Sequence, residues 1–268
     1  MDKYVVLEKE VGQTPLQALE LYRIAHPELK EVPMAYAGRL DPMASGKLLI
    51  LIGEECKVQE QYHDLDKEYE FSVLFGIQSD TGDVLGRIKA ERAPRIPEID
   101  LYEVVHHAVG DITLPYPHFS SKTVQGKPLH VWTLEERLAE IEIPTYTATI
   151  HALSLLKFES KTGREIAEQA LTKIETIPPV TEESKALGRD FRREDVRKDW
   201  QQFRDTYGGS RYVIATFSCV CSKGLYMRTL AERIAKELNT EGLAFHIHRT
   251  KIGAFQPLFR WGFWKKQF

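Results

Sequence analysis

Apolar residues in the first 110 positions fall into short runs and helical stripes that are separated by turn residues. Runs bounded by glycine indicate buried strands, and a Thr-Pro pair or a proline in the first turn indicates the start of a helix. We expect strands at Val5–Leu7, Lys47–Ile52 and Tyr69–Phe75, a helix that begins at Thr14 and Pro15, and a helix at Pro97–Val109. The apolar side of the first helix comprises Leu16, Leu19, Leu21 and Ile24.

The second half of the chain shows a different pattern. Alternating apolar positions predict a long strand at Thr145–Phe158, another strand that begins at Tyr212, and a helix from about Tyr226 to Leu238. Residues 160–210 are dense in charge and contain Pro178 and Pro179, so we expect one or two surface helices there. Strands separated by helices, with hairpin-like spacing, predict an α+β domain on a mixed, mainly antiparallel sheet.

Charge, hydrophobic runs and cysteine spacing limit the classes of protein to which the chain can belong. The chain has 268 residues and a formal net charge of -3, so a nucleic-acid site would need its positive charge concentrated on one face. The N-terminus has no apolar stretch typical of a signal peptide, and no run reaches membrane-spanning length, which favours a cytoplasmic protein. Cys56, Cys219 and Cys221 have no metal-binding or redox spacing, and we interpret them as small buried residues.

One short motif carries candidate chemistry. Asp41 lies between Leu40 and Pro42, with Gly38 and Gly46 on either side, directly before the apolar run at Lys47–Ile52. Such a loop can present a carboxylate at the mouth of a cleft while the following strand fixes its position. The alternative is that Asp41 only caps a turn, because Asp-Pro is common in turns.

Five segments of the sequence, including this motif, resemble one protein family and occur in the same order as in that family. The stretch AGRLDPMASGKLLILIGEECK closely resembles the segment around the catalytic aspartate of the TruB family of pseudouridine synthases. Four more blocks resemble that family in the same order, at Lys67–Glu70, Ser79–Gly86, Phe119–Lys127 and Cys221–Leu230. The resemblance covers most of the chain outside residues 160–210. It implies the pseudouridine synthase fold, a long sheet flanked by helices with a central active-site cleft.

The resemblance also assigns roles to particular residues. Pseudouridine formation breaks the bond between ribose C1′ and base N1 and rejoins the base through C5. The family's nucleophile matches Asp41, and its arginine matches Arg228, whose charge would favour the ionised carboxylate. Tyr69 matches the tyrosine that stacks on the target base and takes part in proton transfer. Taken alone, however, Tyr69 is compatible with an ordinary strand aromatic and Arg228 with a helix surface charge.

Substrate contacts are expected from a further set of residues. The resemblance places Ile247 in the uracil pocket, and Lys223, near the start of a helix, is either a phosphate contact or a solvated charge. The expected substrate-binding residues are Lys9, Tyr36, Arg39, Lys223, Tyr226 and Ile247. The histidines His63, His106, His107 and His130 have no partners at metal-ligand spacing, and the chemistry needs no metal or organic cofactor.

Four departures from the family pattern bear on how RNA would bind. Tyr36 occupies the position of a family histidine that contacts RNA, and the N-terminal block at Glu8–Pro15 is altered. Only thirteen residues follow Phe255, so we expect no separate C-terminal RNA-binding domain. The charged insertion at 160–210 is expected to bind tRNA, to dock a partner or to be a solvated appendage. Its basic residues cluster at Arg189, Arg192, Arg193, Arg197 and Lys198.

The expected function is therefore that of a tRNA pseudouridine synthase. It would act as a monomer on the T-arm of tRNA, with the uridine at position 55 as its target if it follows the bacterial family. A non-catalytic RNA-binding or tRNA-folding factor on the same scaffold is the alternative from another class. A synthase with a different RNA target is the third possibility.

Overall fold

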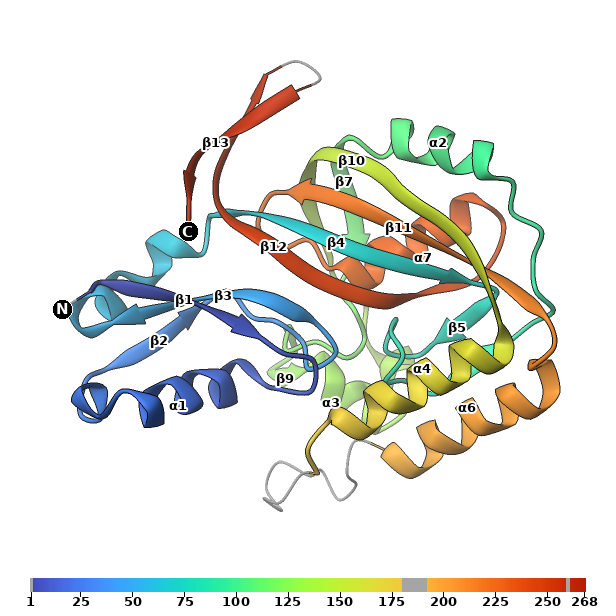
Figure 1. Ribbon diagram of the computed structural model, residues 1–268, viewed down its shortest axis with the longest axis horizontal. Coiled ribbons are helices and arrows are strands. Elements are labelled where there is room, and N and C mark those ends of the chain that lie inside the picture. The colour runs from blue at the N-terminus through green and yellow to red at the C-terminus, as the bar shows by residue number, and fades with distance from the viewer. Residues whose placement is uncertain (1, 180–191, 259–260) are drawn as a thin grey trace.

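One large sheet organises the protein (Figure 1). The computed structural model describes residues 2–179, 192–258 and 261–268, and within these ranges nine strands form the sheet. The order is β1-β3-β12-β4-β11-β10-β7, with β2 beside β3 and β13 beside β12. The strands are β1 (Tyr4–Lys9), β2 (Met34–Ala37), β3 (Ser45–Ile52), β4 (Asp66–Phe75), β7 (Gly110–Pro115), β10 (Thr145–Thr162), β11 (Arg211–Cys221), β12 (Gly242–Leu258) and β13 (Trp261–Gln267).

Helices cover this sheet, and smaller hairpins lie at its border. The helices are α1 (Pro15–Ala25), α2 (Glu98–His107), α3 (Leu129–Leu134), α4 (Gly163–Thr176), α6 (Arg193–Tyr207) and α7 (Met227–Glu237), with 3-10 turns η1 (Pro27–Leu29), η2 (Gly53–Tyr62) and η3 (Leu138–Glu140). Two short hairpins pair β5 (Ile77–Ser79) with β6 (Ile88–Ala90) and β8 (Thr123–Val124) with β9 (Lys127–Pro128). All neighbouring strands of the large sheet run antiparallel except β3 and β12. The predicted α+β class, with a mixed and mainly antiparallel sheet, is confirmed.

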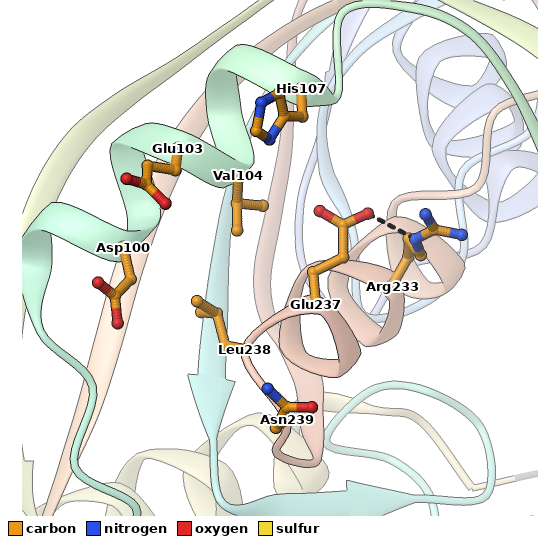
Figure 2. Close-up of a pocket in the computed structure, with 8 residues that line it drawn as sticks. All are labelled: Asp100, Glu103, Val104, His107, Arg233, Glu237, Leu238 and Asn239. Atoms are coloured by element: carbon orange, nitrogen blue, oxygen red, sulfur yellow. Dashed lines mark hydrogen bonds and ion pairs between the residues drawn. The ribbon is translucent and has the colours of Figure 1, made fainter.

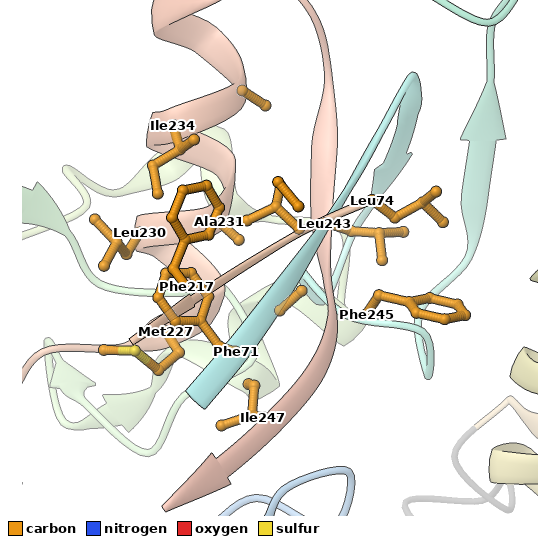
Figure 3. Close-up of a cluster of buried hydrophobic side chains, with 14 of the residues drawn as sticks. Phe71, Leu74, Phe217, Met227, Leu230, Ala231, Ile234, Leu243, Phe245 and Ile247 are labelled. Carbon is orange, nitrogen blue, oxygen red and sulfur yellow. The ribbon is translucent and has the colours of Figure 1, made fainter. Parts of the chain in front are cut away.

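Part of the main core lies between α7 and the centre of the sheet (Figure 3). Apolar side chains from one face of α7 pack against β4, β11 and β12, and the rings of Phe71 and Phe217 stack with centroids 5.5 Å apart. Cys219 and Cys221 are buried in the same core, as the sequence predicts. This packing fixes the N-terminal turn of α7, and with it Arg228, against the sheet.

Helix α1 begins where the sequence predicts, but its buried face is different. Thr14 caps the helix and exchanges hydrogen bonds with Gln17, which forms a capping box. Of the four apolar residues expected to pack, Leu19 is buried, whereas Leu16, Leu21 and Ile24 are exposed. The reason is helical geometry, because the stripe that faces β2 and β3 runs through positions 15, 18, 19 and 22.

One or two helices were predicted within residues 160–210, and the structure has two, α4 and α6, which lie side by side (Figure 1). They are not a solvated appendage, because one face of each helix belongs to the main core. Trp200 is fully buried, and its Nε1 donates a hydrogen bond of 3.0 Å to the carbonyl of Val84. The expectation of a surface position is therefore wrong for these inner faces. Arg189 lies outside the described residues.

Replacing Trp200 with alanine is expected to destabilise the whole protein. The change removes a fully buried indole and leaves the Val84 carbonyl without this donor. Buried Trp→Ala changes cost about 3–5 kcal/mol. Chemical denaturation of Trp200→Ala measures the loss, and Lys198→Ala, an exposed position on the same helix, is the matched control. A loss for Trp200→Ala no larger than that of the control would contradict the assignment of α6 to the core.

The sequence patterns locate most of the other elements, with one large omission. Strands were expected at β1, β3, β4, β10 and β11 and helices at α2 and α7, and all of them are present. No element was predicted for residues 242–268, where β12 and β13 form, and β12 is a central strand of the sheet. None of the helices in the described ranges is both long enough and apolar enough to cross a membrane.

Candidate active site

Asp41 lies on a tight loop between β2 and β3. Gly38 and Gly46, which flank this loop, have φ values of 85° and 106°, a region that favours glycine. A Cβ on Gly46 would come within 2.3 Å of the Arg249 carbonyl oxygen, so only glycine lets the loop pack this closely against β12. The Asp41 side chain is 42% exposed, which leaves it accessible to a substrate.

Arg228, in the first turn of α7, pairs with Asp41 and lines the same cleft. Its Nε lies 2.8 Å from Asp41 Oδ2, at an angle that makes the contact an ion pair rather than a hydrogen bond. Nη1 donates to the carbonyl of Thr81 (2.8 Å) and Nη2 to that of Phe119 (3.4 Å). The guanidinium is 5% exposed, so its position is fixed by these contacts.

Asp83 is a second, deeper carboxylate beside the same guanidinium. Its Oδ2 lies 3.8 Å from Arg228 Nε, and its Oδ1 accepts hydrogen bonds from the Thr81 hydroxyl and the Leu85 amide. Burial raises the pKa of Asp83, and the attraction of Arg228 offsets part of that rise. Arg228 is therefore placed between an exposed carboxylate, which can react, and a buried one, which can only neutralise charge.

Tyr69 lies at the centre of β4, between Cys219 on β11 and Arg249 on β12. It is 9% exposed, and burial raises the pKa of its hydroxyl, so the phenol stays protonated near neutral pH. Tyr69 lines the same cleft as Asp41 and Arg228. Three residues far apart in the sequence thus come together, as the resemblance implies.

The cleft has a volume of about 850 Å³, and more cationic than anionic side chains line it. Two aspartates line it, Asp41 and Asp83. The lysines and arginines along it are Arg39, Lys67, Arg192, Arg193, Lys223, Arg228 and Arg249. A chain with a net charge of -3 therefore concentrates positive charge where it would meet a polyanion.

Four of the six expected substrate-binding residues line the cleft, namely Arg39, Lys223, Tyr226 and Ile247. Arg39 donates a hydrogen bond of 2.7 Å to the Ser121 hydroxyl, and Lys223 pairs with Asp64 at the rim. These contacts hold both cations at the mouth of the cleft. Ile247 is buried and lines the cleft, where an apolar side chain can pack against a nucleobase.

Lys9 and Tyr36 do not line the cleft. Lys9 is fully buried, its ammonium donates to the carbonyls of Glu10 (2.9 Å) and Gln13 (2.7 Å), and burial lowers its pKa to about 8. It stabilises the turn before α1 instead of facing a substrate. Tyr36 packs beside Leu19 and Leu48, because its position on β2 directs it toward α1. The structure thus places both residues away from the expected substrate contacts.

Arg249 is a cleft residue that the sequence analysis did not single out. It is 1% exposed, Nε donates to the Lys47 carbonyl (2.7 Å) and Nη1 to the Arg39 carbonyl (3.2 Å). These two carbonyls lie on either side of Asp41 in the sequence, so the Arg249 side chain connects both ends of the Asp41 loop to β12. The available signal was an arginine directly after the strand-like run at Phe245–His248.

A second hollow of about 550 Å³ lies between α2 and α7 (Figure 2). Asp100, Glu103 and Glu237 line it, and Glu237 pairs with Arg233. It contains none of the expected site residues, and its carboxylates would repel a phosphate. No group of three metal-ligating side chains occurs within the described parts of the chain.

Comparisons with known proteins agree with this geometry. The sequence profile of TruB family pseudouridylate synthase (N terminal domain) matches residues 28–177. The tRNA pseudouridine synthase B of Caldicellulosiruptor saccharolyticus is 26% identical over 95% of this chain and 69% of its own length. The enzyme of that name from Bordetella avium is 27% identical over 95% of this chain and 82% of its own length. The enzyme from Rickettsia akari is also 27% identical, over 85% of this chain and 60% of its own length.

Solved structures show the same fold. The structure described as a Cbf5-Nop10-Gar1 complex superposes with a TM-score of 0.55 at 15% identity, over 93% of this chain and 48% of that chain. A second solved structure is described as an H/ACA RNP bound to a substrate RNA containing 2′-deoxyuridine. It superposes with a TM-score of 0.51 at 14% identity, over 92% of this chain and 46% of that chain. The sheet, the cleft and the matched profile agree, and the chain belongs to the TruB family of pseudouridylate synthases.

Proposed function

We propose that this protein isomerises a uridine in the T-loop of tRNA, at position 55, to pseudouridine, with Asp41 as the nucleophile. One observation carries the proposal. An accessible carboxylate lies 2.8 Å from the Nε of a buried arginine, in a cationic cleft that also contains a buried tyrosine. The relatives named tRNA pseudouridine synthase B support the same activity and the same class of RNA.

The geometry supports a covalent mechanism. The Asp41 carboxylate adds to the ribose or to the base, the bond between C1′ and N1 breaks, and the base turns within the cleft. A bond then forms between C1′ and C5, the bond to Asp41 breaks and restores the carboxylate, the C5 proton leaves, and N1 gains a proton, so the product is an isomer of the substrate. Arg228 pairs with Asp41 and orients it, and Tyr69 offers a protonated hydroxyl to the proton transfers.

The target base must leave its stack before it reaches Asp41. Flipping costs a few kcal/mol, which stacking on an aromatic ring and phosphate contacts can offset. Tyr69 supplies a ring at the cleft, and Arg39 and Lys223 supply charge at its rim. The cleft therefore contains the residue types that flipping a base out of a folded RNA loop requires.

Mapping pseudouridine in total RNA with and without this protein tests the proposal. We expect loss of the modification at position 55 of tRNA when the protein is absent, and restoration when wild-type protein is added to unmodified transcripts. Loss at another position would assign a different target. No change at any position would indicate an RNA-binding factor without synthase activity.

Replacing Tyr69 with phenylalanine is expected to leave tRNA binding near normal and to lower turnover severely. The ring and its packing remain, but the hydroxyl is lost. Single-turnover kinetics with saturating enzyme separates these effects, and Tyr62→Phe, a tyrosine that does not line the cleft, is the matched control. Full activity in Tyr69→Phe would reduce this residue to a stacking surface.

A further inference from the structure

Helix α6 holds one loop of the active site along its length. The loop, residues 80–87, connects β5 to β6. Arg87 donates from Nε (2.6 Å) and Nη2 (3.1 Å) to the carboxylate of Asp199, which also accepts from the Ile88 amide. Trp200 donates to the Val84 carbonyl, in the middle of the loop. Side chains from the charged insertion thus hold the loop at its centre and at its far end.

Arg192, immediately before α6, holds the near end of the loop and a second segment. Its guanidinium pairs with the carboxylate of Asp80 through both Nη atoms. It also lies over the ring of Phe119, 4.6 Å from the centroid. The backbone of Arg192 is left-handed, with a φ of 56°, a conformation that surrounding contacts must stabilise in a residue with a side chain.

The two segments that Arg192 contacts are the two that supply carbonyl acceptors to Arg228. Thr81, next to Asp80, accepts from Arg228 Nη1, and Phe119 accepts from Nη2. Asp83, in the same loop, adds its buried carboxylate. If Arg192 moved, the segments that contain Thr81 and Phe119 would lose one of their contacts. Both carbonyl acceptors of Arg228 could then shift.

We propose that the charged insertion positions the catalytic guanidinium, with Arg192 as the positioning residue that holds Arg228 against Asp41. The inference rests on the proposed function and deepens it. It gives the insertion a role that differs from the three expected from the sequence, which were to bind tRNA, to dock a partner or to be a solvated appendage. Arg192 lines the cleft, so the alternative to be tested is a direct contact with an RNA phosphate.

Kinetics of matched variants separates positioning from RNA contact. For Arg192→Ala we expect the single-turnover rate at saturating tRNA to fall on the order of a hundredfold, because small misplacements of catalytic groups cost that much. The tRNA Kd and its salt dependence should stay unchanged. Asp80→Ala should reproduce the loss although Asp80 does not line the cleft, and the double variant should be no slower than the slower single variant. Lys198→Ala, exposed on α6, should behave as wild type.

Weaker binding with a shallower salt slope and an unchanged saturated rate would assign Arg192 to a phosphate contact and overturn the proposal. A crystal structure of Arg192→Ala decides the matter without any activity measurement. Movement of Arg228 Nε away from Asp41 supports positioning, and an unchanged ion pair refutes it. Wild-type protein inactive on every tRNA would instead refute the proposed function and leave this structural test intact.

Discussion

Replacing Asp41 with alanine or asparagine is expected to abolish isomerisation while leaving tRNA affinity within about tenfold of wild type. A nucleophile that forms a covalent bond has no substitute in the cleft, because Asp83 is buried behind Arg228. The fold should survive, because Asp83 still neutralises Arg228. Asparagine keeps the shape of the side chain, so its inactivity would isolate the role of the carboxylate.

Release of tritium from tRNA labelled at uridine C5 measures this loss directly. Asp205→Asn, an exposed carboxylate on α6, controls for a general change in charge. Turnover by Asp41→Ala near the wild-type rate would refute the assignment of the nucleophile. Loss of binding together with turnover would instead show that the loop of residues 38–46 needs Asp41 in order to fold.

Replacing Arg228 with alanine is expected to remove most activity and also to destabilise the protein. The change takes away the partner of Asp41 and leaves Asp83 buried without a counter-charge. Breaking a buried pair in this way costs about 3–5 kcal/mol. Arg228→Lys keeps the charge but loses the planar group that reaches Asp41, Thr81 and Phe119 together, so we expect only partial recovery of activity.

A double variant separates the two effects of Arg228. Arg228→Met with Asp83→Asn removes both buried charges, and asparagine can still accept hydrogen bonds from Thr81 and Leu85. Thermal unfolding should show stability recovered relative to Arg228→Ala, while tritium release stays absent. Activity in the double variant would mean that the Asp41 carboxylate works without its arginine.

The sequence motifs identify three residues that the structure brings into one cleft, but not all of the elements that hold them there. Asp41, Tyr69 and Arg228 belong to local motifs, and local motifs can be recognised without knowing how the chain folds. The contacts of Lys9 and Tyr36 depend on how α1 and β2 pack, which no local pattern encodes. Arg249 was overlooked for the same reason, because its carbonyl partners lie about 200 residues earlier in the chain.

The charged insertion was expected on the surface because its high charge density concealed the helical spacing of its apolar residues. Between Arg193 and Tyr207, the apolar positions Val196, Trp200 and Phe203 are spaced as i, i+4 and i+7, which is the stripe of a helix packed on a core. Charged residues surround this stripe and dominate any average over the segment. For this helix, the spacing of the apolar residues therefore predicts burial better than the charge density of the segment does.

The place of β12 in the sheet has a consequence for biosynthesis. This strand lies between β3 and β4, although it is encoded about 190 residues after β3 and 170 after β4. A nascent chain can form the β1–β2–β3 unit early, but it cannot join that unit to β4 until residues 242–258 have left the ribosome. Contacts so distant in sequence slow folding. The carboxylate on the early unit and the tyrosine of β4 therefore meet only after β12 has been made, and a nascent chain that lacks this strand has no complete site.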